Sequence, residues 1–164
     1  MATESSAVLS SLDTDELNEP IQKLFGNIIR KRQSGPHPEC RLIHTLVSDE
    51  RNILPRWRAD FDAYIKAIGD VNLARQKAEA DLLGRAERCN PSEFDNYWGD
   101  FYAEISAVNE LVRIKRFMQF VPILSRQDGT YDYEALAEGN TVAIEVKNAR
   151  SPITITDVFA AVSR

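Results

Sequence analysis

The segment at residues 130–148 constrains the fold of this chain more than any other. Two short runs rich in Tyr, Val and Ile flank the triplet Glu138-Gly139-Asn140. β-branched and aromatic residues favour strands, whereas Gly and Asn favour the left-handed backbone of a tight turn. The segment therefore predicts a β-hairpin.

The position of the turn decides which residues of the hairpin lie opposite one another. With a turn at residues 138–139, Asp132 lies opposite Glu145. With a turn one residue later, Glu134 takes that place. In both registers carboxylates of the first strand lie beside Glu145 on one face, whereas a three-residue loop would reverse the faces.

Carboxylates crowded on one face of a hairpin indicate a bound cation. Like charges directly opposite one another destabilise an exposed sheet by roughly 0.2–1 kcal/mol, and by more where water is excluded. Oxygen ligands without Cys or His select Mg²⁺, Mn²⁺ or Ca²⁺ rather than Zn²⁺. Lys147 lies two residues after Glu145 and brings an ammonium group to the same face. We therefore expect a cation site on this face.

A helix is expected before the strands, from residue 94 to about residue 115. Glu104 falls inside its apolar arc, and Glu110 lies at the edge of that arc. A carboxylate on an apolar face needs a partner. That partner is either the cation site or an internal salt bridge to Arg113 or Lys115, so the choice between the two glutamates stays open. The arc is formed by Phe101, Ile105, Val108, Leu111 and Val112.

These residues together resemble the PD-(D/E)XK nuclease superfamily, which has the restriction-endonuclease-like fold. The resemblance rests on Asp132, on the Glu-Val-Lys run at residues 145–147 and on the Glu-bearing helix before them, and it covers residues 96 to about 164. Tyr131 stands where the family usually has Pro. The implied fold is an α+β or α/β chain with an α-β-β-β-α core, here truncated at the C-terminus because the family's strand after the last helix is missing.

The resemblance implies a metal-dependent nuclease that hydrolyses phosphodiester bonds, with DNA as the family's commonest target. Asp132, Glu145 and the backbone carbonyl of Val146 would hold Mg²⁺ or Mn²⁺. Lys147 would orient or activate the attacking water, and Glu104 would support the metal site. The catalytic residues implied are thus Asp132, Glu145, Lys147 and Glu104.

Two other interpretations stay open. The first is a catalytically inactive module on the nuclease fold that binds nucleic acid or serves assembly. The second is a purely structural hairpin, in which Asp132 and Lys147 form a cross-strand ion pair. Short motifs of this kind match by chance often enough that both interpretations carry weight.

The rest of the chain is predicted to be a helical N-terminal region at residues 1–91, with residues 1–11 disordered, followed by the nuclease-like domain at residues 92–164. The pattern is helical from residue 55 to residue 89, with a break at Gly69. We expect this region to pack on the nuclease-like core or on a second copy of itself, which would give a homodimer.

Two shorter stretches of the N-terminal region are harder to interpret. Residues 40–47 are too few to choose between helix and strand. Four basic residues follow Gly69 and could track a nucleic-acid backbone, but acidic residues interleave with them, a mixture typical of a solvated helix face. The basic residues are Arg75, Lys77, Arg85 and Arg88, and the acidic ones are Glu79, Asp81 and Glu87.

Charge and hydrophobicity restrict the kinds of partner that this chain is expected to have. The net charge of −5 over 164 residues gives no overall basic field of the kind that marks many nucleic-acid-binding proteins. No apolar stretch approaches the roughly 20 residues of a membrane span, so we expect no membrane partner and an intracellular protein, cytoplasmic or nuclear.

Overall fold

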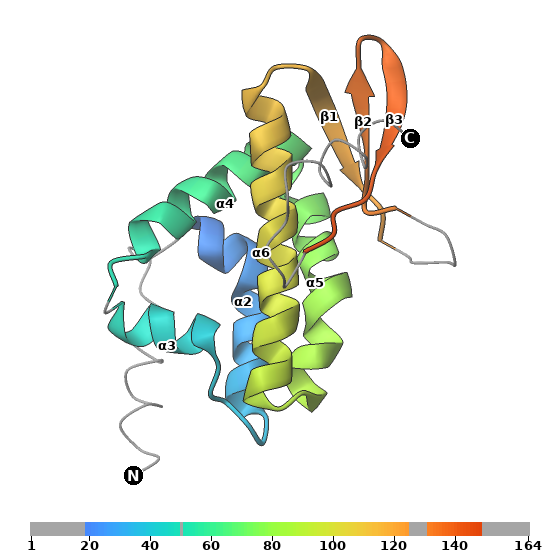
Figure 1. Ribbon diagram of the computed structural model, residues 1–164. Coiled ribbons are helices and arrows are strands. Elements are labelled where there is room, and N and C mark those ends of the chain that lie inside the picture. The colour runs from blue at the N-terminus through green and yellow to red at the C-terminus, as the bar shows by residue number, and fades with distance from the viewer. Residues whose placement is uncertain (1–18, 50, 125–130, 149–164) are drawn as a thin grey trace.

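The computed structural model describes residues 19–49, 51–124 and 131–148. Within these residues, five helices and a three-stranded sheet form an α+β fold, as the sequence predicted (Figure 1). The elements are α2 (Glu19–Ser34), α3 (Arg41–Ser48), α4 (Leu54–Ile68), α5 (Val71–Arg88), α6 (Pro91–Arg113), β1 (Phe117–Pro122), β2 (Tyr133–Ala137) and β3 (Asn140–Ile144). The predicted disordered terminus and the last helix of the implied α-β-β-β-α core lie outside the described ranges.

The break between α4 and α5 lies where the sequence predicted it. Gly69 has a φ of 79°, a left-handed conformation that costs glycine little because it has no Cβ atom. Asp70 then caps α5, since its carboxylate accepts hydrogen bonds from the N–H groups of Asn72 and Leu73. These two residues explain why one continuous helical pattern folds as two helices.

Helix α6 begins earlier than expected. Its N-cap is Asn90, whose side chain accepts a hydrogen bond from the N–H of Glu93, and Pro91 occupies the first turn. Proline fits there because the first helical N–H has no partner within the helix. The helix therefore begins three residues before the expected start at residue 94. The ambiguous run at residues 40–47 is helical and forms most of α3.

The core of the described residues is a hydrophobic cluster with members on both sides of the predicted boundary at residue 91. At its centre Phe25 lies 5.0 Å from Phe61 and 4.9 Å from Trp98, measured between ring centroids, with the rings edge to face. Each buried aromatic ring contributes roughly 1.5–3 kcal/mol through burial alone. Helices α4 and α5 pack against α6, and α4 also contacts β1. The helical region thus packs on the rest of the chain, which is one of the two arrangements that the sequence left open.

The sheet is antiparallel with the strand order β1-β2-β3. Ala137 pairs with Asn140, and Tyr133 pairs with Ile144, so the turn is Glu138-Gly139 and the later turn is wrong. Both turn residues have positive φ angles of 53° and 81°, the pattern of the type I′ turn that matches the twist of a hairpin.

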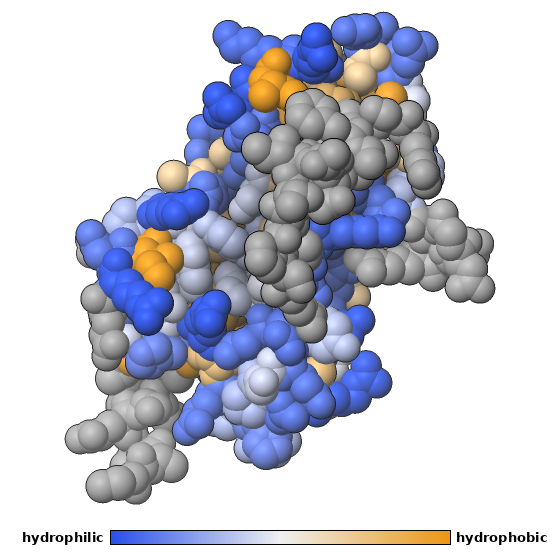
Figure 2. All heavy atoms as spheres, in the orientation of Figure 1, coloured by the Kyte–Doolittle hydropathy of each residue, from blue (hydrophilic) through white to orange (hydrophobic). Residues whose placement is uncertain are grey.

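Much of the surface visible in Figure 2 is hydrophilic, with small apolar patches. One of them lies at the end of the molecule where α6 approaches the sheet, a part of the chain that exposes Ile114 and Met118. No described helix is both long enough and apolar enough to cross a lipid bilayer.

Candidate functional site

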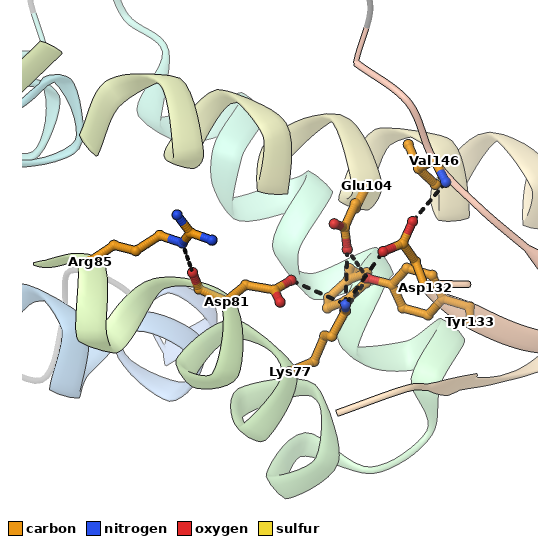
Figure 3. Close-up of polar contacts among 8 residues, drawn as sticks. Lys77, Asp81, Arg85, Glu104, Asp132, Tyr133 and Val146 are labelled. Atoms are coloured by element: carbon orange, nitrogen blue, oxygen red, sulfur yellow. Dashed lines mark hydrogen bonds and ion pairs between the residues drawn. The ribbon is translucent and has the colours of Figure 1, made fainter. Parts of the chain in front are cut away.

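Side chains from helices and sheet meet in a buried group beside the N-terminal end of β2 (Figure 3). Lys77 of α5 is 1% exposed, and Glu104 of α6 and Asp132, which precedes β2, are each 5% exposed. The Lys77 Nζ atom lies 3.5 Å from a Glu104 oxygen and 3.8 Å from an Asp132 oxygen. Asp81, one turn further along α5, approaches the same ammonium to 3.1 Å. We call these four residues the carboxylate–lysine cluster.

Glu104 is the helix carboxylate that the structure places in the cluster. It lies on the buried side of α6 with Phe101, Ile105 and Val108. Its pKa is raised from an ordinary 4.5 to about 7, chiefly by burial; the Lys77 ammonium opposes the rise, and the charges of Asp81 and Asp132 add to it. The carboxyl group is therefore poised to exchange a proton near neutral pH.

Glu110, the other candidate on α6, lies on the surface. Its carboxylate accepts two hydrogen bonds from the guanidinium group of Arg113, one from Nη2 at 2.5 Å and one from Nε at 2.9 Å. This pairing lowers the pKa of Glu110. The internal salt bridge that we considered for either glutamate is thus found for Glu110, while Glu104 has buried partners.

Two tyrosines hold the Glu104 carboxyl group in place. The Tyr133 hydroxyl donates a hydrogen bond of 3.0 Å to Glu104, and it lies 2.8 Å from the Tyr64 hydroxyl. Burial is the largest cause of the raised pKa of both tyrosines, so both hydroxyls stay protonated. The chain of hydrogen bonds runs from α4 through β2 to α6 and fixes the orientation of the carboxyl group.

Asp132 lies just beyond the paired part of the hairpin, whose last pair is Tyr133 with Ile144. Its N–H donates to the Ile144 carbonyl at 2.9 Å. The N–H of Val146 then donates to the Asp132 carboxylate at 2.8 Å, where a backbone carbonyl would be expected. The side chain of Asp132 thus substitutes for the backbone and lies between Lys77 and Val146 (Figure 3).

The structure does not bring Glu145 and Lys147 into the cluster. Their side chains are 57% and 80% exposed and lie 3.6 Å apart from each other as an ion pair. Strand β3 ends at Ile144, whereas the prediction continued the strand through Lys147. Asp132 is buried, whereas the Glu145 side chain is largely exposed to solvent.

Lys77 is the residue that sequence reasoning missed. We interpreted the charged residues of α5 as a solvated face, and for Lys77 this was wrong because it is almost fully buried. One signal was present: Lys77 lies directly before Ala78 and three residues after Ala74, on the stripe of small residues that α5 buries. A lysine on such a stripe needs an acidic partner, and Asp81 stands four residues later.

The cluster carries more acidic than basic groups. Three carboxylates face one ammonium, an excess of two negative charges when all four groups are ionised. Such an excess is costly to bury, so either a carboxyl group takes up a proton or a cation binds. The donors are all oxygen atoms, which suits Mg²⁺ or Mn²⁺.

The arrangement itself does not gather a set of metal ligands. Across the described ranges, no group of three or more His, Cys, Asp or Glu side chains is placed so that it could hold a metal ion. Instead, the Lys77 ammonium lies between Glu104 and Asp132 (Figure 3). The chemistry of the donors thus fits a divalent cation, while the space between them is taken by a side chain of the protein.

Comparison of the chain with protein-family models, with curated proteins and with solved structures gave no match.

Proposed function

We propose that this chain is a metal-dependent nuclease that hydrolyses phosphodiester bonds, with DNA as its substrate. The observation that carries the proposal is the meeting of Glu104, Asp132 and the backbone of Val146, which come from three separate parts of the chain. The succession of α6 and three antiparallel strands supports a restriction-endonuclease-like core.

In this proposal Asp132 and Glu145 hold Mg²⁺ or Mn²⁺ together with the backbone of Val146, and Glu104 supports them. The cation would polarise a phosphate oxygen and lower the pKa of a bound water molecule. The protein keeps Asp132 oriented through the Val146 N–H group, and keeps Glu104 oriented through the Tyr133 hydroxyl. Such fixed orientation is what positioning and electrostatic catalysis require.

Glu145 and Lys147 lie on the solvent side of this centre. The two residues flank Val146, whose N–H donates a hydrogen bond to Asp132. Each exposed side chain is therefore one residue away in sequence from a contact of the buried cluster. A polymer such as DNA reaches the centre only from solvent. In this proposal Lys147 would meet a phosphate group as the substrate approaches, in keeping with a role beside the attacking water.

A second candidate function is an inactive module on the nuclease fold that binds nucleic acid or serves assembly. The observation that favours it is the position of Lys77, whose ammonium neutralises part of the charge that a metal would otherwise neutralise. In that case the cluster is purely structural and binds no divalent cation.

Cleavage assays on three polymers test the proposal and choose the substrate. Plasmid DNA, single-stranded DNA and RNA are each incubated with the protein in Mg²⁺, in Mn²⁺ and in EDTA. We expect cleavage of DNA that requires the divalent cation and is abolished in Asp132→Asn. Cleavage that survives in Asp132→Asn indicates a contaminating nuclease, and absence of metal-dependent cleavage of all three polymers favours the inactive module.

Helix α6 offers a matched control for these assays. Glu104→Gln and Glu110→Gln remove the same charge from the same helix, but only Glu104 lies in the cluster. We expect the first substitution to lower the cleavage rate by at least about 100-fold and the second to leave it within about twofold. Equal effects of the two substitutions would show that general charge, and not the cluster, determines the rate.

A further inference from the structure

The large apolar side chains that the described residues expose are concentrated in one segment. Six such side chains are exposed, and five of them belong to residues 112–124, at the end of α6 and along β1. Apolar side chains gathered in one place on a surface mark interaction sites, whereas scattered ones need no explanation. We propose that this segment, which we call the β1 surface, is a docking site for an acidic amphipathic helix of another protein. The five side chains are those of Val112, Ile114, Met118, Val121 and Leu124.

A β-bulge places two of these side chains on the same open face of the sheet. Met118 and Val121 are 59% and 47% exposed, and they pair with residues 136 and 134 of β2. Those two positions alternate with the buried Tyr133 and Ala135, so they face away from the core. In a regular strand, residues three apart lie on opposite faces, but the register shifts here at Gln119, whose φ is 54°. The bulge therefore adds apolar area to the face that the helices leave uncovered.

The end of the β1 surface next to α6 is basic. Arg113, Lys115 and Arg116 are exposed there, interleaved with the apolar side chains. Arg113 pairs with Glu110, whereas Lys115 and Arg116 form no ion pair within the ranges that the structure describes. The whole chain carries a net charge of −5, so this end is a local exception that attracts negative groups.

Charge and shape together indicate the partner. A second copy docked on the same surface about a twofold axis would bring the basic groups of both copies together, and like charges across an interface are costly. A nucleic-acid duplex offers phosphates to the basic groups but contacts proteins chiefly through its charged backbone. In folded proteins, an open apolar sheet face is covered by the apolar stripe of a helix. Acidic side chains on that helix would meet Lys115 and Arg116, so both properties of the surface are used. The proposal is independent of the proposed metal site.

Fluorescence anisotropy with synthetic peptides tests the proposal on the full chain. The first peptide has about 18 residues, enough to form a helix, and carries Leu on one helix face and Glu on the other. A second peptide has the same composition with Leu spread around the helix, and a third has Lys in place of Glu. We expect the parent protein to bind the first peptide with a Kd on the order of 10 µM, and the other two at least about tenfold more weakly.

One pair of matched variants tests the apolar part of the surface. Val121→Thr and Val47→Thr make the same change at side chains that are 47% and 40% exposed, but Val47 lies on α3, outside the β1 surface. We expect Val121→Thr to weaken binding of the first peptide at least about fivefold and Val47→Thr to leave it unchanged.

A second pair tests the basic part. Lys115→Gln/Arg116→Gln removes two positive charges from the β1 surface, and Lys23→Gln/Lys66→Gln removes two from exposed lysines on α2 and α4. We expect at least about tenfold weaker binding for the first double variant and a change within about twofold for the second. The parent alone gives a readout that needs no variant, because its binding should weaken at least about tenfold from about 50 mM to about 500 mM NaCl.

Several results would overturn the proposal. These are failure of the parent to bind the first peptide, equal binding of the peptide with scattered Leu, and control variants that lose as much affinity as their counterparts. Vesicles of phosphatidylserine and phosphatidylcholine, and a DNA duplex in EDTA, are tested with the same proteins. Binding of either that depends on Lys115 and Arg116, without binding of the peptide, would assign the β1 surface to a membrane or to nucleic acid instead.

Discussion

Substitution of Glu104 by glutamine should change how the stability of this protein depends on pH. Burial raises the pKa of Glu104 from 4.5 to about 7, so the folded protein binds a proton there that the unfolded chain releases at lower pH. The folded state is then favoured by the protonated carboxyl group. This contribution to stability is fully present below pH 4.5 and is lost as the pH rises through 7.

The size of the effect follows from the pKa shift. Each unit of pKa difference corresponds to about 1.4 kcal/mol, so the shift to about 7 corresponds to a loss on the order of 3 kcal/mol between pH 4.5 and pH 8. Glutamine has nearly the same shape and can still accept the hydrogen bond from Tyr133, but it does not ionise. Relative to Glu104→Gln, the parent should therefore lose about this amount of unfolding free energy over the interval.

Urea unfolding at a series of pH values measures this difference. The difference between parent and variant isolates Glu104, because the other titrating groups contribute to both proteins. Glu110→Gln is the control, since its carboxylate is fully exposed and paired with Arg113. A difference in unfolding free energy between parent and variant that stays constant with pH would refute the reasoning. A difference that grows in favour of the parent as the pH rises would also refute it, and would mean that the ion pair with Lys77 outweighs burial.

Three further predictions concern single substitutions. Tyr133→Phe removes the hydroxyl that donates to Glu104 and should lower the unfolding free energy by roughly 1–3 kcal/mol in urea, because a buried acceptor loses its donor. Lys147→Met should change the unfolding free energy by less than about 0.5 kcal/mol, since its ion pair with Glu145 is exposed; a larger loss would mean that the pair is structural. Gly139→Ala should destabilise the hairpin by about 1 kcal/mol because φ is positive there, and a stability equal to that of the parent in thermal unfolding would contradict the type I′ turn.

Local signals in the sequence predicted much of the fold. Gly69 and Gly139 mark the positions where the backbone must turn left-handed, and both lie where the chain reverses direction. The apolar arc of the helix before the strands predicted that Glu104 would need a partner, and the structure supplies Tyr133 and Lys77. These features depend on residues close in sequence, so pattern and turn chemistry suffice for them.

The rest depends on contacts between distant segments. The burial of Lys77 requires α6 and the start of β2 to close over α5, and within α5 only its place on the stripe of small residues indicates it. The side chain of Asp132 accepts a hydrogen bond from the N–H of Val146, so a side chain takes the place of a backbone acceptor. Ideal alternation carries no information about such a contact, and the sequence therefore did not predict that Asp132 is buried while Glu145 is largely exposed.

We propose that Glu104 and Asp132 act as one centre of metal-dependent phosphodiester hydrolysis. A double-mutant cycle of single-turnover DNA cleavage in Mn²⁺, with Glu104→Gln, Asp132→Asn and the double variant, tests it most directly. Residues that act as a unit are strongly non-additive, so each single substitution should lower the rate by at least about 100-fold and the double variant by little more than either. Folded single variants that keep the parent's rate, or losses that multiply in the double variant, would contradict the claim.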